Sequence, residues 1–248
     1  MQVLMGFIIG VFVGLTGIGG GSFTTPLLLL VTGLSGAEAV GTALTFSMVL
    51  RILAAPFYIA GKQVHFRYLK LMLIGAFPGL LGGTYILAIL NVRRWNEAIF
   101  ITLGVLLISS AVLTVLCRNR RLLRSDASWL PWLTLPIGVE TGFSSAGAGA
   151  LGSIFLLNCP EMSASKVVGT DLLFGIVLAA GGSLLHFAFG SISVSVLKGL
   201  LWGGVPGVLL GCLFAPNIPA TRLRSLIVGV TLLLGFQLIW SGVHGATH

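Results

Sequence analysis

Residues 14–26 read GLTGIGGGSFTTP, and their chemistry is that of an exposed peptide backbone. Three consecutive glycines, Gly19, Gly20 and Gly21, interrupt an apolar segment, and each costs a helix roughly 1 kcal/mol relative to alanine. We therefore expect one helix to end before the glycines and another to begin behind them. The free N–H groups and positive dipole end of that second helix favour an anion, and the nearby hydroxyls add donors.

A second break of this kind is expected at SSAGAG, residues 144–149, because the chain repeats itself at an offset of 128. Residues 14–83 and 142–211 share 22 identities in 70 positions, among them a Gly-Thr and a Pro-Gly pair. Coincident pairs at one offset indicate an internal duplication. The expected divisions of the chain are a first repeat at 1–116, a basic cytoplasmic linker at 117–129 and a second repeat at 130–248.

An anion site is expected between the two breaks, with contributions from the duplicated Gly-Thr pairs and from one arginine deep in an apolar segment. The alternative is that the glycines only allow close helix packing in lipid. Packing is the interpretation we favour for the glycines spaced by four, which are Gly75, Gly79, Gly83, Gly203, Gly207 and Gly211. The residues expected to bind the anion are Gly19, Gly20, Gly21, Ser22, Thr24, Thr42, Ser145, Gly147, Gly149, Thr170 and Arg51.

Two acidic residues are candidates for carrying a coupling proton. Asp171 follows the second Gly-Thr pair, and Glu140 precedes the second break. Acids inside a membrane are costly, and a carboxylate that exchanges a proton would link transport to the proton gradient. The alternatives are a helix N-cap for Asp171 and an interfacial position for Glu140. Arg51 either neutralises the anion, or snorkels or pairs with a carbonyl.

The chain is too apolar for a soluble domain. Of its 248 residues, 56% are hydrophobic and 8% are charged, against about 25% charged in a typical soluble domain. Several apolar runs reach the ~20 residues that cross a bilayer. The net charge of +8 comes from short loops, where it sets orientation, so no nucleic-acid partner is expected. Three scattered cysteines and no clustered ligands predict neither a metal site nor a cofactor.

Each repeat contains one broken apolar segment followed by three unbroken ones. The short arms of the broken segment suit a re-entrant hairpin, and the repeats then have opposite orientations. If both broken segments are hairpins and the linker is in the cytoplasm, ten basic residues lie inside and three outside. If both broken segments cross the membrane, the count becomes eight inside and five outside. The positive-inside rule favours the first count. The expected fold is an all-α polytopic membrane protein with two inverted structural repeats, each a re-entrant or broken helical hairpin plus three transmembrane helices.

The run GIGGGSFTTP at 17–26, its altered second copy ending in NCP at 158–160, and the AVGT and VVGT helix starts resemble the sulfite exporter TauE/SafE family. The resemblance covers essentially the whole chain. It implies a secondary transporter of small sulfur-containing anions such as sulfite, thiosulfate, sulfoacetate or sulfonates. The second copy departs from the first where Pro26 is matched by Ile154, and the breadth of the family leaves the cargo open.

We therefore expect a secondary transporter that binds a small, sulfur-containing anion between two glycine-rich tips near the midplane, with proton coupling as a further hypothesis. An anion channel is the alternative. A membrane-embedded enzyme is a weaker one, because the sequence has neither H-E-x-x-H nor G-x-S-x-G. The expected location is the bacterial inner membrane, with the anion and the lipid bilayer as partners and the oligomeric state left open.

Overall fold

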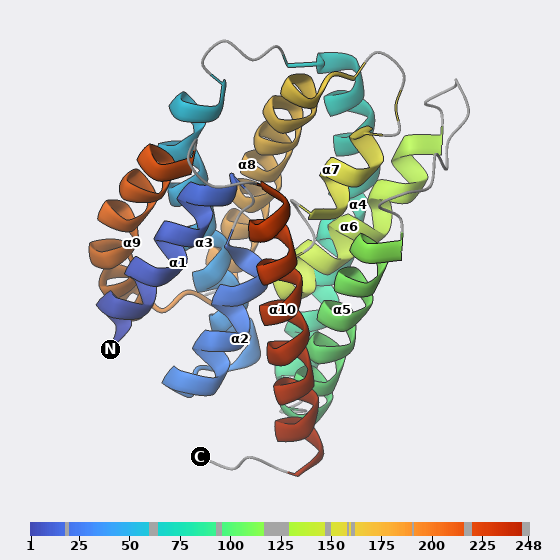
Figure 1. Cartoon of the computed structure of the whole chain (residues 1–248). Helices are drawn as coiled ribbons and strands as arrows, with labels where there is room; N and C mark the ends of the chain where they lie inside the picture. Colours follow the sequence, from blue (N-terminus) through green and yellow to red (C-terminus); the bar gives the residue numbers. More distant parts are fainter. Residues whose placement is uncertain are drawn as a thin grey trace.

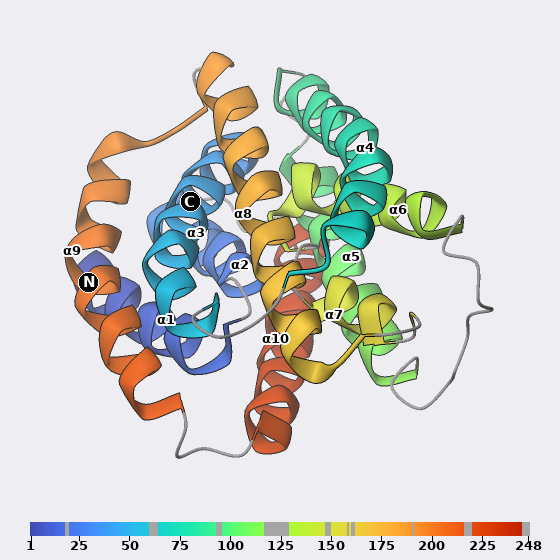
Figure 2. The same cartoon turned by 90° about the horizontal axis from the view of Figure 1, so that it is seen from above.

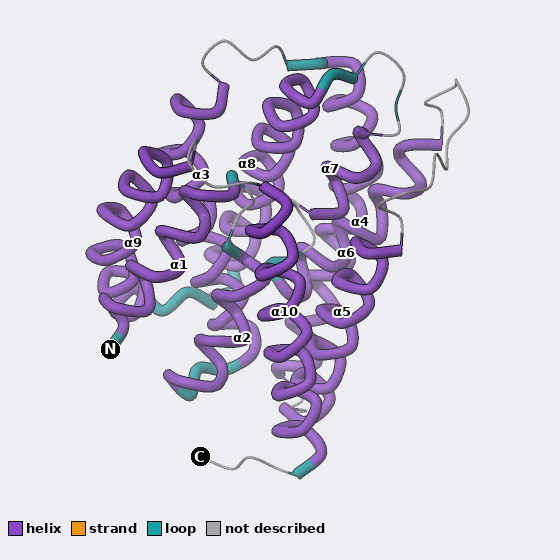
Figure 3. Tube along the Cα trace, viewed as in Figure 1, coloured by secondary structure: helices purple, strands orange, loops and turns teal. Residues whose placement is uncertain are grey.

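The protein is described from a computed structural model of the whole chain. The structure describes residues 1–17, 20–59, 64–92, 96–116, 129–146, 150–157, 159, 162–189, 191–215 and 220–244. Over these residues it contains ten α-helices and no strand, as the helical tube of Figure 3 makes plain. The all-helical class predicted from the sequence is confirmed. The linker expected at 117–129 falls, apart from its last residue, outside the described residues.

The helices occupy the predicted apolar segments (Figure 1). Those of the first half are α1 (Gln2–Thr16), α2 (Gly21–Thr32), α3 (Gly36–Ile59), α4 (Phe66–Val92) and α5 (Asn96–Leu116). Those of the second half are α6 (Leu130–Ser144), α7 (Ala150–Leu157), α8 (Ala164–Ala188), α9 (Val194–Phe214) and α10 (Ala220–Val243). Each helix of the second half begins close to the place that the offset of 128 predicts. Each half therefore has two short helices, where a broken segment was expected, followed by three longer ones.

Over the described residues, four helices are long and apolar enough to cross a membrane, namely α3, α4, α8 and α9. The sequence predicted six unbroken spans, and α5 and α10 are the two that fall outside this set. Their described apolar stretches are shorter and run over 97–113 and 228–243. The remaining helices, α1, α2, α6 and α7, have 15, 12, 15 and 8 residues, too few for an untilted helix to cross a bilayer.

The helices α3 and α8 pack against each other in the middle of the bundle. Seen from above, α1 and α9 lie on one side of them and α4 and α6 on the other (Figure 2). Thr45 of α3 contacts Ser183 of α8, and Gly41 lies against His186, so the residue numbers run in opposite directions. The two helices are therefore antiparallel. Their close-packed side chains fix this crossing, because packed interiors resist displacement.

Glycines hold α1 against α9 and α4 against α6. A Cβ on any of the predicted packing glycines would collide with a backbone carbonyl of the neighbouring helix. That carbonyl belongs to α1 for the α9 residues Gly203, Gly207 and Gly211, and to α6 for the α4 residues Gly75, Gly79 and Gly83. Small residues let helix backbones approach closely in an apolar solvent. In both pairs the residue numbers rise together, so the helices are parallel. The packing prediction for these six glycines is confirmed.

Candidate functional site

The two helix breaks have the same backbone conformation. Helix α1 ends at Gly17, whose φ of 66° is left-handed and whose N–H donates to the Val13 carbonyl. Helix α6 ends at Ser145, which has a φ of 64° and an N–H that donates to the Thr141 carbonyl. Glycine is the usual residue in such a cap. Ser145 is the single non-glycine residue with a positive φ in the described ranges, a conformation that costs roughly 1 kcal/mol or more.

The two breaks touch each other through hydroxyl groups. Ser145 Oγ donates to the Gly21 carbonyl at 3.0 Å and lies 2.7 Å from Thr25 Oγ1. Because Ser145 uses its one hydrogen on Gly21, the Thr25 hydroxyl donates to Ser145. Ser22 Oγ donates to the Ala146 carbonyl at 3.5 Å. The strained serine therefore ties the end of α6 to the start of α2.

Part of the predicted anion site is brought together at this contact. The described members are Gly20, Gly21, Ser22, Thr24 and Ser145. Thr24 Oγ1 donates to the Gly20 carbonyl at 2.8 Å, which closes the first turn of α2. The predicted members Gly19, Gly147 and Gly149 lie outside the described residues.

The two described glycines at the contact face protein atoms. A Cβ on Gly21 would collide with the Ser145 carbonyl, and a Cβ on Gly20 would lie 2.8 Å from methyl groups of both Ile9 and Val13. Both glycines are among the residues expected to bind the anion. In this structure the space is used by helix–helix contact instead.

Thr42 and Thr170, the two threonines of the duplicated Gly-Thr pairs, make matching hydrogen bonds. Thr42 Oγ1 accepts from the N–H of Ser193 at 3.0 Å, and Thr170 Oγ1 accepts from the N–H of His65 at 3.0 Å. Ser193 and His65 are themselves 128 residues apart and immediately precede α9 and α4. Both threonines are fully buried. Their hydroxyls therefore hold the starts of two long helices and make no described bond to either break.

A second polar cluster joins α3, α7 and α8. Asp171 Oδ2 accepts a hydrogen bond of 2.7 Å from Ser153 Oγ of α7. The Arg51 guanidinium of α3 lies against Gly175 of α8, in the space that a Cβ would fill. Asp171 is the negative charge that acts on Arg51. Two predicted site residues from opposite halves of the chain are thus brought together.

The place of this cluster in the fold excludes one of the earlier alternatives, the capping role of Asp171. Arg51 and Asp171 are each 4% exposed, so both lie inside the bundle. The N-cap of α8 is Ser163, whose side chain accepts from the N–H of Lys166, so Asp171 is not the cap of its helix. The alternative of Asp171 as an N-cap is wrong.

Glu140, the other candidate for proton coupling, lies on a different pair of helices. It is 5% exposed on α6, and the Ser110 side chain of α5 hydrogen-bonds to its carboxyl group. Its Oε1 atom has no hydrogen-bond partner among the described residues. No group of three or more His, Cys, Asp or Glu side chains in the described residues could hold a metal ion.

Ser153 and Gly175 are not among the site residues predicted from the sequence. A signal for Ser153 exists, because the offset of 128 pairs it with Thr25, and both positions carry a hydroxyl behind a helix break. The offset pairs Gly175 with Ser47 and gives no such signal. The role of Gly175 arises only from the approach of Arg51 in the folded chain.

Comparison with known proteins places these features in a family context. The family model described as "Sulfite exporter TauE/SafE" matches residues 2–238. The probable membrane transporter protein YjnA of Bacillus subtilis (strain 168) is 31% identical over 250 residues, covering 96% of this chain and 98% of YjnA. The probable membrane transporter protein YdhB of the same organism is 26% identical, covering 96% of this chain and 99% of YdhB. No solved structure matches the chain.

Proposed function

The chain belongs to the sulfite exporter TauE/SafE family, and on this premise we propose that it is a secondary transporter of a small sulfur-containing anion. Its membrane-transporter class follows from the family and from relatives that cover nearly the whole chain. The observation that carries the proposal is the contact between the two helix breaks, where Ser145 meets Gly21 and Thr25. Non-helical backbone at membrane depth is tolerated where protein buries it or where it lines a pathway.

The anion binds beside this contact, between the starts of α2 and α7. The first N–H groups of a helix have no partner within the helix and carry the positive end of its dipole. Ser22, which is only partly buried, adds a hydroxyl next to the N-cap Gly20. Two helix starts from two halves thus supply the electropositive backbone that a small anion requires.

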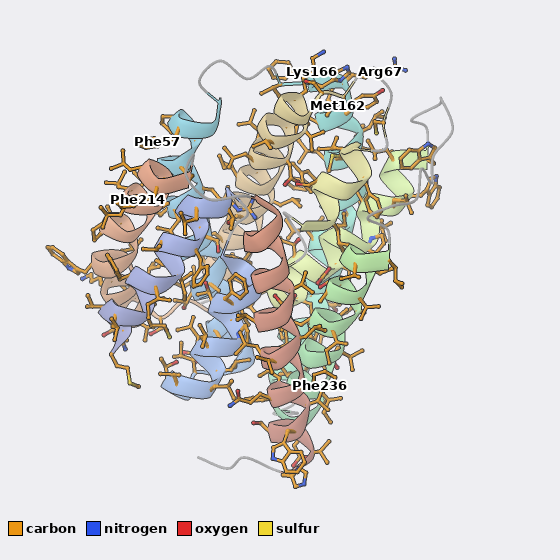
Figure 4. The ribbon with its side chains drawn as sticks, viewed as in Figure 1. Phe57, Arg67, Met162, Lys166, Phe214 and Phe236 are labelled. Carbon is orange, nitrogen blue, oxygen red and sulfur yellow. The ribbon has the colours of Figure 1, made fainter. Side chains whose placement is uncertain are left out.

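Two inverted repeats are part of the proposal, and the helix directions support them. The counterparts α3 and α8 run antiparallel, and in Figure 1 α1 rises and α2 descends, whereas α6 descends and α7 rises. Arg67 and Lys166, both counted as cytoplasmic, lie at the same end of the molecule in Figure 4. Reporter fusions after Ser128 and at the C-terminus should therefore give opposite signals. Fusions that report the same side would overturn the inverted arrangement.

Proton coupling is the remaining part, with Asp171 as the carrier and Glu140 as the second candidate. Both carboxyl groups are buried in a chain with only six acidic residues. Buried ionisable groups in membrane segments mark ion and proton pathways. An anion channel would use the same backbone site and would need no such carboxyl group.

The decisive experiment combines binding and flux. We expect purified protein in detergent to show a thermal shift with sulfite, thiosulfate or a sulfonate that exceeds the shift with acetate. In proteoliposomes the uptake of the bound anion should saturate, and an imposed pH gradient should drive accumulation above the external concentration. Flux that only dissipates the anion gradient would identify a channel, and no shift with any anion of the panel would overturn the substrate class.

A further inference from the structure

The Arg51 guanidinium is built into the interface between the two halves. It occupies the space beside Gly175 on α8 that any larger residue would fill with a Cβ. At 4% exposure it is shielded from solvent on all sides. A buried arginine is always charged and requires a negative partner, because an uncompensated charge in the interior is very costly.

Asp171 lies within reach of this guanidinium on the same helix face. Residues four apart on a helix are neighbours, so Asp171 lies one turn before Gly175 on the surface that faces Arg51. Its Oδ2 is held by the Ser153 hydroxyl of α7, and its Oδ1 lies against Gly152, which leaves that edge of α7 without a side chain. Ser153 therefore positions the carboxylate from α7.

We propose that Arg51 and Asp171 form a charge pair that the transported anion opens: the guanidinium exchanges the Asp171 carboxylate for the anion, and the released carboxylate takes up a proton. This inference rests on the proposed function and assigns a residue to each of its two ligands. The pair adjoins the proposed anion site, because Asp171 contacts Gly152 and Ser153 in the first turn of α7. In this exchange the anion that pairs with Arg51 is either the Asp171 carboxylate or the cargo. Proton and anion therefore bind cooperatively, which is what symport requires.

Among the described residues around α8, Arg51 is the counter-charge of Asp171. Helix α4 packs beside α8 and presents Met72 next to Gly152, while its basic residues Arg67 and Lys70 are exposed. His65, just before α4, donates its backbone N–H to Thr170 and stacks its ring on Tyr68. On α7 the facing group is Ser153, and on α6 the carboxyl of Glu140 is engaged by Ser110.

The pair exists once in the chain although the scaffold is duplicated. The offset of 128 matches Asp171 with Ala43 and Arg51 with Ala179. Neither counterpart carries a charge. The proposed exchange therefore has one site in the chain, at this pair.

The first test measures thermal unfolding of full-length protein in detergent, with and without sodium sulfite, for Asp171→Asn, Arg51→Gln and the double variant. Asp171→Asn should lower the Tm without ligand, because Arg51 loses its partner, and should bind sulfite about tenfold more tightly, because its competitor is gone. Arg51→Gln should lose the sulfite-induced shift. A merely structural Asp171 would give weaker sulfite binding in Asp171→Asn, and that result would overturn the exchange.

The second test uses the duplication as its control. Gly175→Ala places a methyl group where the guanidinium lies and should weaken sulfite binding at least about tenfold. Ser47→Ala leaves a methyl side chain at the matching position of α3 by removing the buried Ser47 hydroxyl, which has no described partner, and should leave binding unchanged. Equal binding by both variants would overturn the placement of the anion at Arg51.

The ligand-free Tm values separate this inference from the proposed function. If no anion of the panel shifts the wild-type Tm, the proposed substrate class and the anion exchange fall together. The pair itself is still supported if the Tm loss of the double variant is smaller than the sum of the Tm losses of Arg51→Gln and Asp171→Asn. Strictly additive Tm losses would overturn the pair, even in a protein that transports.

Discussion

Equivalent positions in the two halves use their hydroxyl groups differently. Thr25, behind the first break, bonds across the molecule to Ser145 of the second break. Ser153, its counterpart 128 residues later, instead donates to Asp171 in the following helix. The breaks themselves are alike, since Gly17 and Ser145 share the left-handed conformation. The halves thus agree in backbone and diverge in side-chain chemistry.

Three buried ionisable residues illustrate this divergence. Arg51, Asp171 and Glu140 each match an apolar residue at the offset of 128, namely Ala179, Ala43 and Phe12. The glycine contacts between helices, in contrast, occur in both halves. A duplicated scaffold therefore carries charge chemistry in a single copy, and the following predictions probe that contrast.

The largest effect is expected at the contact between the breaks. Gly21→Val would drive a side chain into the Ser145 carbonyl and separate the two tips. Anion uptake into proteoliposomes should fall to the level of empty liposomes. The control is Gly82→Val, because a Cβ at Gly82 meets no atom within 4 Å. Unchanged uptake by Gly21→Val would move the transport pathway away from the tips.

The glycine contacts should respond equally in the two halves. Gly83→Ala and Gly211→Ala, which are 128 apart, each press a Cβ into a carbonyl of the neighbouring helix. Each should lower the free energy of unfolding by about 1–3 kcal/mol in a detergent denaturation series, because overpacking is costly. Gly82→Ala, at the neighbouring position of α4 where a Cβ meets no atom within 4 Å, should be neutral or stabilising. A loss in one half alone would break the equivalence of the scaffold.

Ser145 should reveal the balance between backbone strain and hydrogen bonding. Ser145→Ala keeps the left-handed strain and removes the bonds to Gly21 and Thr25, so it should cost about 1–2 kcal/mol of unfolding free energy. Ser145→Gly removes the same bonds and relieves the strain, so it should recover about 0.4–1 kcal/mol of that loss. Equal stability of the two variants in denaturation experiments would show that the strain carries no cost.

The smallest effect is expected at the matched threonines. Thr42→Val and Thr170→Val each leave one backbone N–H, of Ser193 or His65, without its acceptor. Each should lower the free energy of unfolding by about 1 kcal/mol and leave sulfite affinity unchanged. Reduced affinity in either variant, measured by thermal shift, would restore that threonine to the anion site.

Local patterns in the sequence were sufficient to predict the helices, their breaks and their packing glycines. The cost of three consecutive glycines in a helix is a local property, so the break after Gly17 follows from composition alone. Glycines four apart share one helix face, so the contacts of Gly75 and Gly203 could be anticipated without their partners. Burial costs likewise made Asp171 a candidate from its apolar surroundings.

Partners across the bundle were decided only by the tertiary structure. Arg51 meets Gly175 because α3 and α8 cross antiparallel, and this crossing depends on packing between segments far apart in the chain. Ser145 was predicted to bind an anion, but its hydroxyl reaches Gly21 because both breaks are brought to one place. A residue's type and spacing determine which group it offers, whereas the distance between two such groups is a property of the packed helices.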